Sequence, residues 1–318
     1  MIAVREAGES DTTAIVGLLK LSLGERSALR TEEYWRWKHI RNPFGPSRVL
    51  LAFDGSRLVA VRAFMAWRFR MGDRLFPAWR AVDTAVHPQW QGKGLFTRLT
   101  TELIRLLEPE VPAFIFNSPN PRSMAGYLKM GWELWHSAPL AVRVSPLDLL
   151  ANRFRPTASK SLALDLDSAT PVFGSWREAD MMTTDWSIDA LRWRYEQIPG
   201  VRYFSHFESA GGGSCMLIAR MVPRGSFREL RIVECFHEGE VEVVRRCIGE
   251  LIKTTRPDAT SIMLDGAGRL ASLLPFGFLP MSRFAPVLIH RFLNDADALS
   301  RFTDVEKRYL SAGTLELF

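Results

Sequence analysis

The chain has 318 residues, of which 47% are apolar and 24% are charged, and its formal net charge is +6. This length and apolar content allow two buried cores of ordinary size and argue against a disordered chain. The basic balance suits an anionic ligand such as a nucleotide cofactor, an acidic sugar or nucleic acid. The arginines are scattered rather than gathered in one run, which disfavours nucleic acid.

Three further features bear on where the protein works. Every apolar stretch is shorter than the roughly 18–20 residues that a membrane span needs. The first residues lack the basic and then apolar pattern of a secretory signal. Cys215, Cys235 and Cys247 form an odd, sparse set without metal-ligand spacing, so we interpret them as core residues. We therefore expect a cytoplasmic protein with no membrane span, no metal site and no nucleic-acid partner.

In chain order, the first half alternates strand and helix patterns. Ser10 or Asp11 can cap one helix, and a second helix opens at Thr31 and stops before Pro43. The pair Asp54-Gly55 predicts the turn of a hairpin. The expected strands are residues 2–5, 49–53, 58–64, 67–71, 78–86 and 112–116, and two further helices are expected from about residues 92 and 122.

Short segments of the first half recur in the second half in the same order. The matched pairs are residues 35–38 with 191–194 (an offset of 156), 128–132 with 274–278 (an offset of 146) and 138–140 with 285–287 (an offset of 147). Three matches in one order, with a drift of about ten residues, favour two copies of one fold over chance similarity. The expected domains are residues 1–146 and 172–318, joined by a linker over residues 147–171.

The most informative stretch is residues 82–97, Val-Asp-Thr-Ala-Val-His-Pro-Gln-Trp-Gln-Gly-Lys-Gly-Leu-Phe-Thr. It has the pattern of an apolar strand, a short loop with Gly92 and Gly94, and an amphipathic helix. Glycines in such a turn let backbone N–H groups approach a ligand, and the helix N-terminus adds its positive dipole end. Lys93 adds positive charge. The stretch therefore predicts a pyrophosphate cradle, with a glycine-rich turn that binds nothing as the alternative.

This stretch resembles the acetyl-CoA motif of the GNAT superfamily, Arg/Gln-x-x-Gly-x-Gly/Ala after a strand that ends in Val-x-Pro. Gln91, Gly94 and the preceding Val86 match it, whereas Phe96 stands where the family usually has Gly or Ala. The resemblance implies that acetyl-CoA or another acyl-CoA is the cofactor. It implies that the backbone of Ala85 and Val86 pairs with the pantetheine arm. The amides that it assigns to the pyrophosphate are those of Gln91, Gly92, Lys93, Gly94, Leu95, Phe96 and Thr97.

A second family signature lies downstream. Residues 117–123 lead into residues 127–132, Tyr-Leu-Lys-Met-Gly-Trp, which are similar to the GNAT pattern Tyr-x-x-x-Gly-Phe/Trp. By this resemblance Tyr127 protonates the departing thiolate. A phenol, with an ordinary pKa of about 10, is a suitable acid for that step. The alternative is a tyrosine packed on the sheet. Asn117 and Asn120 either bind the pantetheine amides or are plain turn residues.

An amine must lose a proton before it attacks a thioester. Asp83 is the preferred candidate for the base because it lies on the strand that ends at the acyl group; the alternative for Asp83 is a structural hydrogen bond. His39, His87 and Glu133 are further candidates. Direct transfer from acyl-CoA to an amine needs no covalent nucleophile, which agrees with the absence of cysteine near the motif.

The resemblance implies an α/β (α+β) fold with two tandem GNAT-like domains, each a mixed, mostly antiparallel central sheet flanked by helices. Residues 237–242, His-Glu-Gly-Glu-Val-Glu, place three glutamates where the first copy has its glycine loop. Glutamates at a helix start repel a pyrophosphate. Leu273 aligns with Tyr127 at the offset of 146. The second copy is therefore expected to be degenerate and to lack a CoA loop.

The first half implies an acyl-CoA-dependent N-acyltransferase that passes the acyl group directly to a primary amine. A small molecule or a glycan is expected as the acceptor, with an amino sugar or a surface-polysaccharide precursor as the suggested class. Trp35, Trp37, His39 and Trp193 either border the acceptor groove or belong to the core. A non-catalytic acyl-CoA-binding or regulatory module is the alternative function. The phosphate loop argues against a peptidoglycan-bridging type of transferase that uses aminoacyl-tRNA.

Overall fold

The computed structural model describes residues 1–23, 30–107, 111–137, 140–144, 162–169, 181–210, 212–225, 227–263, 273–281, 283, 285–299, 304 and 308–315. Residues 138–139 of the third repeat match, and all of the expected linker 147–171 except residues 162–169, lie outside this part of the chain. Within the described ranges, no helix has both the length and the apolar character needed to cross a membrane.

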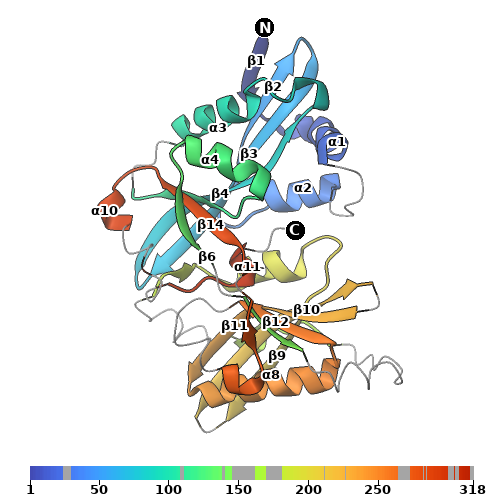
Figure 1. The fold of residues 1–318 in the computed structure, drawn as a ribbon, viewed down its shortest axis with the longest axis vertical. Coiled ribbons are helices and arrows are strands. Elements are labelled where there is room, and N and C mark those ends of the chain that lie inside the picture. Colours follow the sequence, from blue (N-terminus) through green and yellow to red (C-terminus); the bar gives the residue numbers. More distant parts are fainter. Residues whose placement is uncertain are drawn as a thin grey trace.

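Two sheets contain all the described strands (Figure 1). Each is antiparallel apart from one parallel pair, β4 with β5 in the first sheet and β11 with β12 in the second. The first sheet has the order β1 (Ile2–Glu6), β2 (Arg48–Asp54), β3 (Arg57–Met71), β4 (Arg74–Val86), β5 (Phe114–Asn117), β14 (Val287–Phe292), β6 (Glu133–Ser137), with β8 (Thr183–Thr184) paired to β3. The second has the order β13 (Leu279–Pro280), β7 (Leu140–Val144), β12 (Ala259–Met263), β11 (Phe227–Gly239), β10 (Gly213–Arg224), β9 (Phe204–Ala210).

Helices flank both sheets, so the predicted α/β class with mostly antiparallel sheets is confirmed. The helices are α1 (Thr12–Leu23), α2 (Glu32–His39), α3 (Leu95–Arg105), α4 (Pro121–Lys129), α7 (Ile188–Leu191), α8 (Val241–Thr255), α10 (Ala296–Leu299) and α11 (Ala312–Leu315), with a π-helix over Arg192–Glu196. Short 3-10 turns lie at Glu9–Asp11, Pro88–Trp90, Asp167–Ala169 and Leu274–Phe276.

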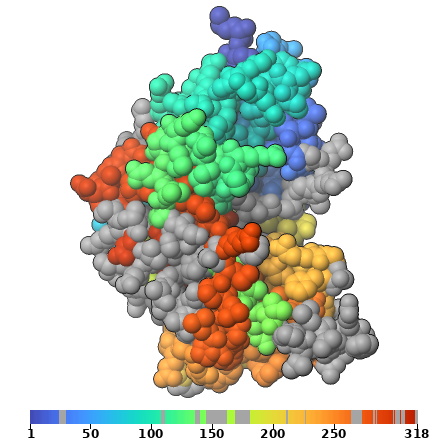
Figure 2. Space-filling view, in the orientation of Figure 1, coloured from blue at the N-terminus to red at the C-terminus, as the bar shows by residue number. Residues whose placement is uncertain are grey.

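The alternation of β3 decides which helices cover which face of the first sheet. Val61 and Ala63 join the core cluster that contains α1 and α2, whereas Ala60 and Phe64 join the cluster of α3 and α4. Successive side chains of a strand point to opposite faces. α3 and α4 therefore lie side by side on one face, as the teal and green surfaces in Figure 2 show, and α1 and α2 lie on the other.

The two halves exchange strands. β7 follows β6 in the chain but leaves the first sheet and pairs with β12 and β13 in the second. β14 makes the reverse move and pairs with β5 and β6 in the first sheet. The sheets therefore do not separate at residue 146. The boundaries 1–146 and 172–318 remain a prediction, with β7 of the first range in the second sheet and β8 and β14 of the second range in the first sheet.

Two predicted strands turned out to be one. The sequence predicted a break between residues 64 and 67, but β3 continues from Arg57 to Met71 against β4, which starts at Arg74 rather than near residue 78. The extension is held by β8, which pairs Thr184 with Phe69. This contact joins residues more than a hundred positions apart, so local patterning could not indicate it.

The packing between the halves centres on two tryptophans related by the offset of 156. Trp37 of α2 and Trp193 of the π-helix stack with ring centroids 4.9 Å apart. Each indole donates to the other residue's carbonyl, Trp37 Nε1 to Trp193 O at 2.7 Å and Trp193 Nε1 to Trp37 O at 2.9 Å. Both side chains are 2% exposed, so they belong to a core that both halves share.

The C-terminal segment 308–315 is inserted between the halves (Figure 1). Arg80 of β4 donates to the carbonyls of Thr314 and Leu315, and Arg194 donates to that of Gly313 at 3.2 Å. A Cβ at Gly313 would overlap the Tyr195 hydroxyl and the Glu234 carboxylate. The segment thus connects the strand that leads to the candidate active site with the second half.

Candidate active site

The two central strands of the first sheet separate toward the end of β4. β4 pairs in parallel with β5 only from Ala78 to Arg80. Further along, a bulge interrupts its pairing with β3, and Asp83 adopts a φ of +41° there. A bulge bends its strand and redirects its side chains, and a positive φ in aspartate persists only where the surroundings hold it. The end of β4 therefore turns away from β5, and no described strand pairs with that edge.

A cleft of about 500 Å³ lies beside this edge. Its walls come from the end of β4, the turn that follows, the starts of α3 and α4, and the end of α1. The size falls within the roughly 300–1,000 Å³ typical of small-ligand sites. The lining residues are Ser22, Leu23, Thr84, Ala85, Val86, Trp90, Gln91, Gly92, Gly94, Leu95, Phe96, Asn120, Arg122, Ser123 and Gly126.

The turn between β4 and α3 presents backbone amides to this cleft. Gly92 and Gly94 both have a φ of 75°, and an added Cβ would meet no atom within 4 Å at either, so glycine serves the backbone conformation rather than close packing. Gly94 is the N-cap of α3 and has no side chain to bond the first N–H groups. Gln91 Nε2 donates to Val86 O at 3.1 Å and fixes the turn to the strand. The free N–H groups at the start of α3 are suited to binding an anion.

Eight of the eleven predicted cofactor residues line the cleft and three do not. Lys93 and Thr97 are exposed outside the lining, with the Lys93 ammonium 5.5 Å from the Trp90 ring centroid. Asn117 is buried beyond it. The eight residues that the structure gathers are Ala85, Val86, Gln91, Gly92, Gly94, Leu95, Phe96 and Asn120.

The two asparagines both bond the local backbone. The Asn120 side chain accepts from Ser123 N at 3.0 Å and caps α4. The Asn117 side chain accepts from Ser118 N at 2.8 Å. These are the contacts of the turn-residue alternative, although Asn120 also faces the cleft.

Phe96, the departure from the family motif, packs sideways. Its ring meets the Tyr127 ring edge-on with centroids 5.4 Å apart. A Cβ at Gly126 of α4 would lie 3.1 Å from the Phe96 ring. The large side chain at position 96 is thus accommodated because position 126 has none. α3 and α4 can therefore pack closely beside the cleft.

Tyr127 lies beneath the cleft rather than on its surface. Its side chain is 3% exposed, and its hydroxyl accepts from Arg62 at 2.9 Å. Arg62, itself 1% exposed, also donates to the hydroxyl of Thr84, which lines the cleft. Arg62 places a positive charge next to the phenol oxygen, which would become negative if the hydroxyl gave up its proton.

Asp83 is held by two basic side chains from the end of α2. Its Oδ2 lies 2.5 Å from Lys38 Nζ and 2.8 Å from His39 Nε2. The other ring nitrogen of His39 lies 2.8 Å from Ser47 Oγ. Tyr34 and Trp35 are among the residues that line a small cavity of about 40 Å³ with these three groups. We call Lys38, His39 and Asp83 the Asp83 cluster.

Burial and pairing act in opposite directions on the pKa values of the Asp83 cluster. Burial alone would raise the pKa of Asp83, but the Lys38 ammonium and the His39 hydrogen bond outweigh it and hold that pKa far below its usual range. Burial lowers the pKa of both Lys38 and His39, against the opposing effect of Asp83. A carboxylate with so low a pKa is a weak proton acceptor by itself, and the role of Asp83 as the base stays a prediction.

The other two candidate bases lie elsewhere. His87 Nδ1 accepts from Gln89 N at 3.2 Å, and its Nε2 lies 2.7 Å from the Arg57 guanidinium. Burial and Arg57 lower the pKa of His87. The side chain of Glu133, on β6, is 78% exposed. Both ring nitrogens of His87 are thus engaged at the turn that follows β4.

Sequence reasoning missed Lys38, Arg62 and Arg122. Lys38 was visible only as part of the repeat Trp-Arg-Trp-Lys, and Arg122 only as a basic residue at the start of α4. Arg62 lies in an apolar strand, and a charged residue inside such a run was an available signal, because arginine is rarely buried without a partner.

The second half contains a buried polar pair at the position that corresponds to the Asp83 cluster. Tyr195 and Glu234 correspond to His39 and Asp83 by helix offset and strand register, and Tyr195 Oη donates to Glu234 at 2.5 Å. β11 passes into α8 through Glu240 alone, whereas residues 87–94 separate β4 from α3. The backbones of Gly213 and Gly239 approach so closely that a Cβ at either would overlap the other strand. No room for a glycine turn remains there.

Comparison with known proteins agrees with this geometry. A family model, the acetyltransferase (GNAT) domain, matches residues 3–135. No curated protein matches the sequence. The GNAT domain that this model identifies in the chain, residues 3–135, contains the cleft and the Asp83 cluster. The protein is accordingly an N-acetyltransferase, and acyl-CoA-dependent N-acyl transfer is its general chemistry.

Solved structures share the fold over most of the chain. A probable N-acyltransferase from Enterococcus faecalis has 12% identity and a TM-score of 0.64, with 92% of this chain and 73% of that chain covered. A GCN5-related N-acetyltransferase from Anabaena variabilis has 13% identity, a TM-score of 0.64 and the same coverage, 92% and 73%. N-myristoyltransferase from Saccharomyces cerevisiae, with bound myristoyl-CoA, has 12% identity and a TM-score of 0.56, covering 92% and 78%. At these identities the likeness concerns the fold.

Proposed function

We propose that the protein transfers an acetyl group from acetyl-CoA directly to a primary amine, with CoA in the cleft between β4 and α4. The observation that carries this proposal is the glycine turn before α3, whose amides face the same cleft as the unpaired edge of β4. The first feature suits a pyrophosphate and the second an amide-containing arm. Arg122, exposed at the start of α4, offers a positive charge for a further phosphate of CoA.

The pantetheine arm continues the sheet in this proposal. The backbone of Ala85 and Val86 lines the cleft where β5 no longer pairs with β4. An extended chain with amide groups can pair with such an edge as an added strand would. The thioester would then lie near Thr84, at the inner end of the cleft, next to the bulge at Asp83. The acyl group and the Asp83 cluster would meet there.

The space near the bulge supports a small acyl group. Beside the Asp83 cluster the cavity holds about 40 Å³, slightly more than one water molecule's share of the liquid, roughly 30 Å³. Arg62, Tyr127 and Phe96 fill the region under the cleft. We therefore place acetyl rather than a long acyl chain in the site.

The proton transfers are assigned to two groups in this proposal. Tyr127, with Arg62 beside its oxygen, protonates the departing thiolate. The Asp83 cluster takes the proton of the amine as one coupled unit, in which Asp83 orients Lys38 and His39, and their lowered pKa values favour a proton-accepting form. Direct attack of the amine then forms the amide and releases CoA thiol.

The acceptor is proposed to approach from the α1–α2 side. Trp37 and Trp193 are core residues. The aromatic side chains that line the small cavity are those of Trp35 and Tyr34. An amino sugar or a surface-polysaccharide precursor remains the suggested class, because a primary amine on a compact polar body suits so narrow an entry.

The deciding experiment combines calorimetry with acetyl-CoA and release of free thiol in the presence of an amine panel that includes amino sugars. Binding with turnover on at least one amine is the expected result. Binding without turnover across a broad panel would favour an acyl-CoA-binding module. Absence of acetyl-CoA binding would contradict the assignment of the cleft as the CoA site.

A further inference from the structure

A buried cation lies behind the inner end of the CoA cleft. One terminal nitrogen of Arg62 donates to the Thr84 hydroxyl and the other to the Tyr127 hydroxyl at 2.9 Å. Among the described residues no carboxylate contacts this side chain, and its Nε has no hydrogen-bond partner. The guanidinium carbon lies 4.7–5.6 Å from the ring centroids of Phe64, Phe96 and Tyr127, but ring faces carry no net charge. A buried charge without a counter-charge destabilises a fold, so this one needs an explanation.

The bulge in β4 brings Thr84 to this cation. Two residues of β4, Asp83 and Thr84, lie opposite the single residue Arg62 of β3. The Asp83 side chain contacts α2, whereas Thr84 contacts Arg62 on the sheet face of α3 and α4. Ala81 also lies on the face of α3 and α4, so regular alternation would have put Asp83 there instead of Thr84.

Arg62 leaves the protons of both hydroxyls available. A hydroxyl group donates one hydrogen bond and accepts up to two. Thr84 and Tyr127 each accept from Arg62, and neither proton has an acceptor among the described atoms. Thr84 lines the cleft, so its O–H group can donate directly to a bound molecule.

The corresponding positions of the second half are apolar. They are occupied by three buried residues of one core cluster, which packs against α8: Leu217, Cys235 and Leu273. Strand pairing places the first two where Arg62 and Thr84 lie in the first sheet. The third aligns with Tyr127 at the offset of 146. The fold therefore needs no polar group at these positions.

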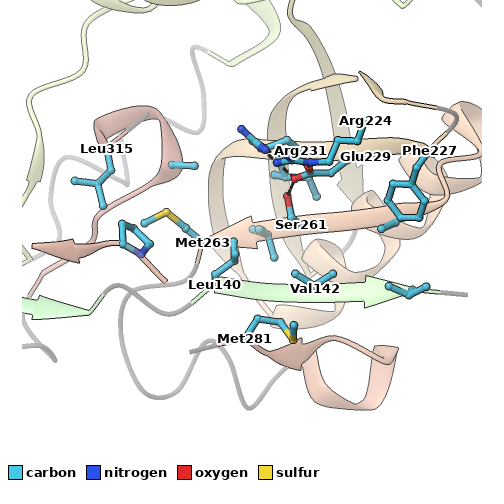
Figure 3. Close-up of a pocket in the computed structure, with 16 residues that line it drawn as sticks. Leu140, Val142, Arg224, Phe227, Glu229, Arg231, Ser261, Met263, Met281 and Leu315 are labelled. Atoms are coloured by element: carbon cyan, nitrogen blue, oxygen red, sulfur yellow. Dashed lines mark hydrogen bonds and ion pairs between the residues drawn. The ribbon is translucent and has the colours of Figure 1, made fainter. Parts of the chain in front are cut away.

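The second half does have an open cavity, but it lies elsewhere. It holds about 750 Å³ over Val142, Ser261 and Arg231, and none of the three apolar residues lines it (Figure 3). Where these positions face no opening, they have apolar side chains. Where the CoA cleft opens beside them, they have a cation and two hydroxyls. This contrast indicates that the polar groups are directed at a ligand.

We propose that the Thr84 hydroxyl donates to the carbonyl oxygen of the bound thioester, and that Arg62 orients this hydroxyl and stabilises the negative charge that develops on that oxygen. This inference rests on the proposed function, because it takes the thioester to lie at the inner end of the cleft. Thr84 is then a catalytic residue, and Arg62 is a positioning residue that acts through it. A donor and a charge already in place need no reorganisation during the reaction.

The electrons and protons balance as follows. The amine nitrogen forms a bond to the carbonyl carbon, and the π electron pair of the carbonyl moves to its oxygen, where Thr84 donates. The pair then re-forms the double bond while the C–S bond breaks with its electrons on sulfur. Tyr127 gives its proton to sulfur, and the Asp83 cluster takes one from nitrogen. Exchange with solvent restores both groups.

The first test records the ¹³C resonance of acetyl-CoA labelled at the acetyl carbonyl and bound to the full chain without an amine. A hydrogen bond to the carbonyl oxygen moves this resonance downfield, so wild type should show a downfield shift from free acetyl-CoA. Thr84→Val should abolish the shift, and Thr84→Ser should keep most of it. Thr100→Val is the matched control and should keep the wild-type shift, because Thr100 is fully buried in α3 and outside the cleft lining.

Kinetics provide a second measurement for the same variants. Thr84→Val is expected to lower kcat about a hundred-fold, as loss of one oxyanion donor does, and to change acetyl-CoA affinity much less. Thr100→Val should keep the wild-type kcat. Equal ¹³C shifts and equal kcat values in the two Val variants would overturn the role of Thr84.

Arg62→Met separates positioning from structural support. It removes a buried charge that no carboxylate balances, so the free energy of unfolding should not fall, whereas kcat should fall about ten-fold or more and the ¹³C shift should decrease. Arg62→Lys keeps the charge and should recover part of kcat. Lower stability with an unchanged ¹³C shift would assign Arg62 a structural role only.

Two results separate this proposal from the proposed function. An unshifted resonance in wild type that binds acetyl-CoA and acetylates an amine would overturn the Thr84 assignment and leave the proposed function in place. Absence of acetyl-CoA binding in calorimetry would contradict both.

Discussion

Individual residues in the first half occupy conformations and environments that ordinary packing does not require. Asp83 takes a positive φ that costs free energy unless neighbours hold it, and Lys38 and His39 do so from another element. Arg62 is buried almost completely, yet its partners are the hydroxyls of Thr84 and Tyr127 rather than a carboxylate. Both arrangements converge on the inner end of one cleft, which favours a catalytic over a structural explanation.

Tyr127→Phe is expected to lower kcat by about ten-fold or more with little change in acetyl-CoA affinity, because it removes a proton donor and keeps the ring that packs on Phe96. Steady-state kinetics and calorimetry measure the two quantities. Unchanged kcat would exclude Tyr127 as the acid.

Asp83→Asn is expected to reduce kcat/KM and to move the acidic limb of its pH profile to lower pH. The Asp83 carboxylate raises the pKa of Lys38 and His39, so its removal lowers both values, and the proton-accepting form then persists at lower pH. A limb that stays in place while the rate falls would assign Asp83 a purely structural role.

At the scale of elements, patterns within a few residues were enough for much of the first half. The Thr31 cap of α2, the hairpin turn at Asp54-Gly55 and the glycines before α3 are local signals, and the structure has those elements. Lys38 and Arg62 could not be assigned, because their partners depend on the bulge in β4 and on the packing of α2 against that strand. The bulge has no local sequence signal comparable to a glycine turn.

The turn before α3 is the element on which cofactor binding depends. Gly94→Glu is expected to abolish detectable acetyl-CoA binding, because it places a carboxylate at the helix start and strains a residue with a φ of 75°. Gly94→Ala shares the strain without the charge and should bind more tightly than the Glu variant. Wild-type affinity in Gly94→Glu, measured by calorimetry, would refute the phosphate position.

At the scale of the whole molecule, the two halves share a core. The element order recurs, Trp37 and Trp193 bond each other reciprocally, and Gly131 and Gly277, related by the offset of 146, have φ values of 77° and 78°. We therefore propose a tandem of two GNAT-like domains in which only the first has kept the cofactor turn. Composition and repeats could suggest the duplication, but not the strand exchange, because pairing between distant strands has no local signal.

Gly313→Ala tests the coupling between the halves. The new methyl group would overlap Tyr195 and Glu234, so the free energy of unfolding is expected to fall by about 1–3 kcal/mol. Gly249→Ala in α8, where an added Cβ meets nothing within 4 Å, is the matched control and should be neutral or slightly stabilising. Denaturant unfolding measures both. Equal stability of the two variants would show that segment 308–315 does not stabilise the shared core.

The position of β14 has a consequence for synthesis of the protein. The gap between β5 and β6 is filled by residues 287–292, which are translated well after both of those strands. The sheet that bears the cofactor turn therefore stays incomplete until β14 has been translated. Nascent chains halted before residue 287 should consequently lack acetyl-CoA binding, even though every residue that faces the cleft has already been made.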